Sequence, residues 1–127
     1  MAVAPVPSPV ATDAVAACRA LIAALPDQVD GHRRRPATGD PERVAAWGDP
    51  PIVLRCASGP LVTPTGATQT YGVQGVRWVT SETGDTIVWT SFGRVVTVEL
   101  RVPAEYEGAR IVTPLSEVIA ATVPARG

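Results

Sequence analysis

The sequence predicts a single α+β domain of two layers, in which an N-terminal and a C-terminal helix cover one face of a mainly antiparallel sheet of about four to five strands. Apolar residues recur at a spacing of three and four near both ends of the chain, and at a spacing of two in the stretches between. Turn-forming residues divide these stretches into the order helix, strand, three-strand meander, helix. A chain of 127 residues is long enough for one core.

The first helix is expected from Thr12 to about Leu25. Thr12 offers a hydroxyl for the cap, Asp13 places a carboxylate in the first turn, and Pro26 ends the helix. The apolar stripe that faces the core consists of Val15, Cys18, Leu21, Ile22 and Leu25. The domain therefore spans residues 12–124.

Residues 1–11 are rich in proline and are expected to form a flexible tether, of the kind that follows a removed signal or anchor segment, and residues 125–127 form a tail.

Periodicity is lost between Pro26 and Pro51, where glycine and proline recur. We expect irregular chain here, with one helical turn from Asp40 to Ala46. Long connections without a repeating element are usually functional or disordered. This one contains Gly31-His32-Arg33-Arg34-Arg35, the densest charge of the chain.

A strand follows from Ile52 to Cys56, in which alternation places Cys56 on the same face as Ile52 and Leu54. The two cysteines allow one intramolecular pairing, Cys18 with Cys56, and both fall on predicted core faces. Two buried thiols, behaving as small apolar residues, are the alternative. Residues 59–75 are expected to be a loop with one short strand at about 69–73.

Three better strands form the meander: Val76–Thr80, Thr86–Thr90 and Arg94–Val102. The last alternates most clearly, so the sheet should have one wet face. A second helix is expected to begin at Thr113 and Pro114. Its apolar stripe consists of Leu115, Val118, Ile119 and Val123.

Composition argues against several classes of function. The formal net charge is -1, which gives no electrostatic reason to expect nucleic acid or an anionic membrane surface as a partner. No apolar run reaches the roughly 18 to 20 residues of a membrane span. His32 is the only histidine and no metal-ligand spacing is present, so we expect no metal and no cofactor. No serine lies in a nucleophile-elbow pattern.

The residues best suited to binding are Arg33, Arg34, Arg35 and Trp47. Arginine forks bind carboxylates and phosphates bidentately, and Trp47 is expected in a loop near them, where it could stack on a sugar. The alternative is that one arginine fastens the long loop while the others are solvated. Trp78 and Trp89, on predicted strands, are expected to fill the core.

Paired carboxylates could hydrolyse glycosides, and the candidate pairs are Asp49 with Glu42 and Glu99 with Glu105. Asp49 precedes a proline in a turn, where an acceptor for turn hydrogen bonds is the simpler interpretation. Glu99 is expected on the wet face of its strand. We therefore predict no catalytic residue.

Several segments together resemble a known family. They are Cys18-Arg19-Ala20-Leu21, Leu25-Pro26, Arg33-Arg34-Arg35-Pro36, Ala46-Trp47-Gly48-Asp49-Pro50-Pro51-Ile52-Val53-Leu54-Arg55-Cys56, Val73-Gln74-Gly75-Val76-Arg77-Trp78 and Gly93-Arg94. This combination resembles the actinobacterial domain-of-unknown-function family 3515, over roughly residues 17–124. The resemblance implies a secreted or membrane-anchored envelope protein and a disulfide between Cys18 and Cys56. It supplies no catalytic residues.

All eleven basic residues are arginine, which is typical of a GC-rich genome and agrees with this resemblance. We hypothesise an extracytoplasmic, non-enzymatic domain that binds an envelope protein or an anionic cell-wall component, and that meets the membrane only through an N-terminal anchor. The alternatives are a small envelope hydrolase that uses Asp49 or Glu42, and a carrier with an apolar cavity between helices and sheet.

Overall fold

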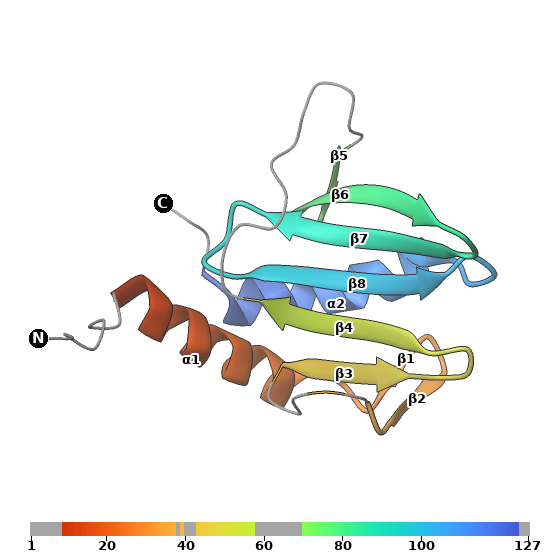
Figure 1. Cartoon of the computed structure of the whole chain (residues 1–127), viewed down its shortest axis with the longest axis horizontal. Helices are drawn as coiled ribbons and strands as arrows, with labels where there is room; N and C mark the ends of the chain where they lie inside the picture. Colours follow the sequence, from red (N-terminus) through yellow and green to blue (C-terminus); the bar gives the residue numbers. More distant parts are fainter. Residues whose placement is uncertain (1–8, 38, 40–42, 58–69, 125–127) are drawn as a thin grey trace, which may run out of the picture.

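The computed structural model describes residues 9–37, 39, 43–57 and 70–124, with side chains from residue 14 onward. Two helices enclose a run of strands along the chain (Figure 1). The elements are α1 (Pro9–Ala24), β1 (Gln28–Val29), β2 (His32–Arg35), β3 (Val44–Trp47), β4 (Ile52–Ala57), β5 (Thr70–Val73), β6 (Val76–Thr83), β7 (Thr86–Phe92), β8 (Thr97–Pro103) and α2 (Gly108–Thr122).

The strands form one antiparallel sheet in the order β1-β2-β3-β4-β8-β7-β6-β5. Its eight strands exceed the expected four to five. Leu54 and Cys56 of β4 and Leu100 of β8 are buried on the face that α1 and α2 cover. The predicted α+β architecture, with two helices packed against a mainly antiparallel sheet, is confirmed. The opposite face is called the open face below.

The predicted disulfide is present and joins α1 to the middle of the sheet. Cys18 and Cys56 are bonded, with their Cα atoms 5.7 Å apart, and both residues are buried. The described residues contain no free cysteine. Thiol chemistry is therefore not available in this oxidised state.

The stretch from Pro26 to Pro51, expected to be irregular, holds the three additional strands β1, β2 and β3. The β1–β2 hairpin turns at Asp30-Gly31, where both residues have positive φ, as a two-residue hairpin turn requires. Strand β3 replaces the expected helical turn, because Val44–Trp47 pairs residue by residue with β4. Pairing supplied by neighbouring strands overrides the missing apolar period.

Both helices begin earlier than expected. Helix α1 begins at Pro9 rather than Thr12, and α2 begins at Gly108 rather than Thr113, so that Pro114 lies inside it. An interior proline costs roughly 3 kcal/mol. Burying Ile111 and Val112 in the first turns contributes about 1.5 to 3 kcal/mol each, which offsets that cost.

Trp78 makes a side-chain hydrogen bond inside the core. Its ring is fully buried, and its Nε1–H donates to the Ser116 hydroxyl of α2 at 3.0 Å. Trp89 packs edge-on against it, with ring centroids 6.3 Å apart. The expectation that Trp78 fills the core is confirmed, while Trp89 is half-buried.

Replacing Ser116 by alanine should lower the free energy of unfolding by about 1 to 3 kcal/mol, because the Trp78 N–H loses its partner inside the core. Urea unfolding followed by tryptophan fluorescence measures this. The matched control is Ser81→Ala on β6, an exposed serine whose loss should stay within about 0.5 kcal/mol. Equal midpoints for the two variants would contradict the assignment.

Arg94 joins the C-terminal end of α2 to the turn between β5 and β6. Its guanidinium donates to the carbonyl oxygens of Val123, at 2.5 Å, and Gly75, at 2.9 Å. Partial burial lowers the pKa of this arginine from its ordinary value. The cation lies at the negative end of the α2 dipole, where it stabilises the helix terminus.

Candidate functional site

The three consecutive arginines of β2 do not form one patch. Alternation places Arg33 and Arg35, both exposed, on one side of the strand and half-buried Arg34 on the other. The Arg34 guanidinium lies 5.6 Å from the centroid of the Trp47 ring, in cation–π geometry. Arg33 and Arg35 are therefore the members of the triplet whose guanidinium groups face solvent.

Trp47 lies in β3 rather than in the expected loop, and it is fully buried. Its Nε1–H donates to the Pro26 carbonyl at 3.0 Å, and its backbone pairs with Ile52 across the β3–β4 hairpin. Residues 48–51 turn the chain so that the indole enters the core. Trp47 supports Arg34 from beneath and offers no surface of its own.

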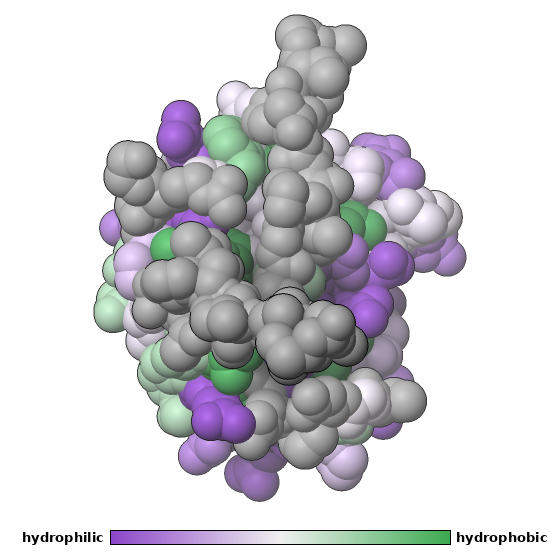
Figure 2. Space-filling view, turned by 60° about the vertical axis from the view of Figure 1, so that its left-hand side comes forward, coloured by the Kyte–Doolittle hydropathy of each residue, from purple (hydrophilic) through white to green (hydrophobic). Residues whose placement is uncertain are grey.

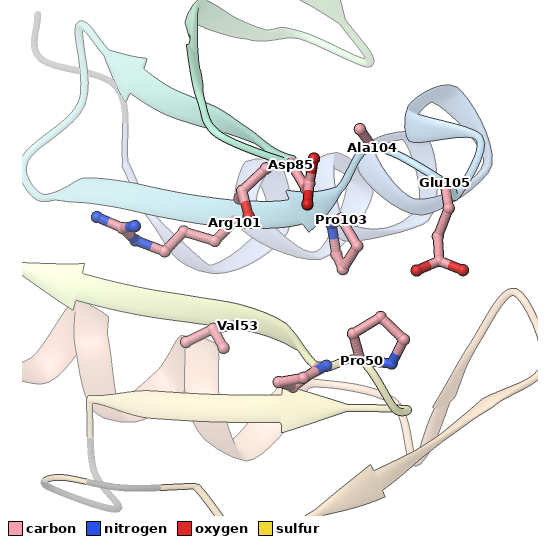
Figure 3. Close-up of a pocket in the computed structure, with 9 residues that line it drawn as sticks. Pro50, Val53, Asp85, Arg101, Pro103, Ala104 and Glu105 are labelled. Atoms are coloured by element: carbon pink, nitrogen blue, oxygen red, sulfur yellow. The ribbon is translucent and has the colours of Figure 1, made fainter.

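The open face contains a hollow of about 510 Å³ between β4 and β8 (Figure 3). Its apolar lining comes from Val53, Ala104 and three prolines, Pro50, Pro51 and Pro103. Figure 3 shows Val53 on β4, and the carboxylates of Asp85 and Glu105 on the side of β8 and the turns beyond it. Arg101 lies along β8 in the same lining.

A backbone hydrogen bond brings Asp85 next to the segment that carries Glu105. Asp85 belongs to the two-residue turn between β6 and β7, and its carbonyl accepts from the Ala104 N–H at 2.7 Å. This bond ties that turn to the connection between β8 and α2, which also carries Glu105. Both acidic side chains are exposed and form no ion pair within the described part of the chain.

A second hollow of about 190 Å³ adjoins the first and shares Pro51 and Val53 with it. Its lining adds Arg35 and Pro36 from the end of β2, and Ala46 from β3. The two hollows lie next to each other across the strands from β2 to β8 and are together called the cross-strand groove below. Both of its parts lie away from the helices.

The two ends of the cross-strand groove differ in charge: the β2 end carries an arginine with a nearby aspartate, and the other end carries two carboxylates. At the β2 end, Arg35 Nη1 donates to the Gly48 carbonyl at 2.9 Å and lies 3.9 Å from the exposed Asp49 carboxylate. At the other end stand Asp85 and Glu105. Arg101, between them, is neutralised by Glu99, whose carboxylate accepts from its Nε at 2.9 Å.

An aromatic contact fixes the turn that forms one wall of the groove. The Tyr106 hydroxyl donates to the Pro50 carbonyl at 2.7 Å, and its ring stacks at a tilt on His32, with centroids 4.3 Å apart. Partial burial raises the pKa of Tyr106, and the carboxylates of Glu105 and Asp49 raise it further. The phenol therefore stays protonated and continues to donate at neutral pH.

Of the two carboxylate pairs singled out from the sequence, Asp49 with Glu42 lies partly outside the described residues, and Glu99 of the other pair forms an ion pair. Asp49 is 92% exposed in its side chain, and Glu42 lies outside the described residues. Glu99 is held by Arg101. No group of three metal-ligating side chains occurs within the described ranges.

Sequence reasoning missed Asp85, Arg101 and Pro103 as groove residues. The sequence pattern places Asp85 in a turn, and Arg101 and Pro103 at the end of a strand. Their meeting with Val53 depends on the pairing of β4 with β8, which are separated along the chain by β5, β6 and β7. No local signal reports that pairing.

On the face shown in Figure 2, hydrophilic and hydrophobic residues of the described part are interspersed. Neither helix, as far as the chain is described, is long and apolar enough to cross a membrane.

Comparison with known proteins gives one match. A family model described as "Protein of unknown function (DUF3515)" matches residues 1–127. No curated protein and no solved structure matches the chain.

Proposed function

This chain belongs to the DUF3515 family of proteins of unknown function, and from that premise we propose that it is an extracytoplasmic, non-enzymatic domain of the cell envelope. Its role is to bind an envelope protein or an anionic cell-wall component. Arg33 and Arg35 make the direct contacts, and Trp47 with Arg34 supports the strand that carries them.

The observation that carries this proposal is the exposure of two arginines on the same side of one short strand. Arg33 and Arg35 alternate with Arg34 along β2, so both present their forks outward. Arg35 is also held by the Gly48 carbonyl, which occupies one of its five N–H donors and orients the remainder. A pre-oriented guanidinium loses less entropy when it binds a carboxylate or a phosphate.

The proposed location rests on the disulfide together with the family resemblance. Disulfides persist in oxidising compartments and are rare in the cytosol. The bond between Cys18 and Cys56 is compatible with an extracytoplasmic home. An actinobacterial origin, a signal or anchor segment and an envelope location remain part of this proposal.

The double variant Arg33→Ala/Arg35→Ala should retain at least tenfold less isolated cell-wall material or envelope extract on immobilised protein. The expected factor follows from hydrogen bonds to charged groups, which contribute about 1.5 to 3 kcal/mol each. The matched control is Arg55→Ala/Arg77→Ala, which removes the same charge from two exposed arginines of β4 and β6 that line neither hollow. Unchanged retention by the β2 variant, or an equal loss in the control, would contradict this site.

A further inference from the structure

The cross-strand groove has a polarity that the arginines alone do not explain. One end carries Arg35, whose contact with the 92% exposed Asp49 carboxylate is long, at 3.9 Å, and leaves guanidinium N–H groups available to a ligand. The middle is apolar at Pro51 and Val53, and the other end carries the carboxylates of Asp85 and Glu105, which form no ion pair with any residue that the structure describes. A purely anionic ligand would be attracted to the first end and repelled by the second. The charge pattern instead fits a ligand with separated charges of both signs.

The strand register gives the length of that ligand. Arg35, Ala46, Val53 and Arg101 are successive cross-strand neighbours on β2, β3, β4 and β8. With about 4.8 Å between strands, this row spans about 14 Å as far as Arg101. Its next member is Val88 of β7, and Asp85 lies three residues before Val88, so the backbone distance from Arg35 to Asp85 is about 21 Å. The charged side chains of the groove and of the ligand each reach several Å into this distance, which shortens the backbone that the ligand needs. An extended peptide advances roughly 3.1 to 3.4 Å per residue, so four to six residues cover the distance.

The lining favours a peptide held by its side chains. Pro36, Pro50, Pro51 and Pro103 have no backbone N–H to offer a strand-like ladder, but they present rigid apolar rings. Rigid walls reduce the ordering cost of binding. The groove is open along its length, which suits a segment delivered by a larger partner better than a small enclosed ligand.

We propose that the cross-strand groove binds an extended segment of a partner protein, four to six residues long. The segment carries an acidic side chain that pairs with Arg35, apolar residues over Pro51 and Val53, and a basic side chain between Asp85 and Glu105. This inference rests on the proposed binding function at Arg35 and adds the chemistry of the partner. The segment crosses the strands instead of extending the sheet.

The test uses a fluorescently labelled pentapeptide, acetyl-Glu-Pro-Ala-Val-Lys-amide, titrated with the whole chain and followed by anisotropy. Three comparison peptides have two acidic ends, two basic ends, or the same composition with the charges adjacent. Exchanging the two charged ends is not informative, because a peptide can bind in either chain direction. We expect the first peptide to bind at least tenfold more tightly than all three.

Variants at the acidic end locate the effect. The variant Asp85→Asn/Glu105→Gln should bind the peptide with one acidic and one basic end about tenfold less tightly. The variant Asp85→Arg/Glu105→Arg should instead bind the peptide with two acidic ends most tightly. These residues are exposed, and a matched exposed control is Glu82→Gln/Glu117→Gln on β6 and α2. Equal binding of all four peptides, or no effect of the Asp85 and Glu105 variants, would overturn the inference.

Failure of this inference is distinguishable from failure of the proposed function. If Arg33→Ala/Arg35→Ala abolishes retention of wall or envelope material while the acidic-end variants change nothing, the function stands and the peptide assignment is overturned. If Arg33→Ala/Arg35→Ala changes neither retention nor peptide binding, both are overturned.

Discussion

Replacing Cys18 and Cys56 together by alanine should lower the free energy of unfolding by about 4 kcal/mol. The two cysteines are 38 residues apart in sequence, so their bond closes a long loop and removes many conformations from the unfolded chain. Alanine is preferred to serine because both positions are buried, and a hydroxyl there would need a partner. The free energy of unfolding of a domain of this size is about 5 to 15 kcal/mol in total, so this loss is a large fraction of it.

The structural consequence should be greatest for α1. The disulfide is the covalent link between this helix and β4, and α1 otherwise packs on α2 and the core through the small residues Ala14 and Ala17 in its first half and through Leu21. Hydrogen exchange should therefore rise in α1 before it rises in β4 or β8.

Urea unfolding of the oxidised protein, the reduced protein and the double variant separates the disulfide from the side-chain change. The reduced protein should fall to about the stability of the variant, and a reducing agent should leave the variant unchanged. If oxidised and reduced protein unfold at the same urea concentration, the bond contributes nothing and the prediction is wrong.

The sequence was informative where side-chain periodicity and burial coincide. Cys18, Leu21 and Leu25 of the predicted stripe are buried, although Val15 at its start is 40% exposed. The alternation in β4 is confirmed, and the two patterns together explain why the disulfide could be anticipated. The same reasoning failed for β2. Its four residues are a histidine and three arginines, so its strand state comes from hydrogen bonds to β1 and β3 and not from an apolar face.

One signal for the missing strands was present and unused. Asp30-Gly31 is a strong two-residue hairpin signal, and it joins Val29 to His32 in the structure. Given that hairpin, the alternation of β2 separates Arg34 from Arg33 and Arg35. The cross-strand groove is different, since it depends on a pairing between β4 and β8 that no local pattern encodes.

Replacing Trp47 by alanine should lower the free energy of unfolding by about 3 to 5 kcal/mol, because the indole is fully buried and fills a large volume in the core. The variant also frees the Pro26 carbonyl from its hydrogen bond and removes the ring beneath Arg34. By contrast, Arg33→Ala and Arg35→Ala should each change stability by no more than about 0.5 kcal/mol.

The variant Trp47→Phe separates packing from hydrogen bonding. Phenylalanine keeps an aromatic ring but cannot donate to Pro26, so it should cost about 1 to 2 kcal/mol, well below the cost of alanine. Measured at a temperature where it stays folded, this variant should retain wall material and bind the charged pentapeptide as the parent does. If Trp47 contacts the ligand directly, the variant should instead lose binding at unchanged stability. That result would contradict the structural role proposed for Trp47 and support the surface role expected from the sequence.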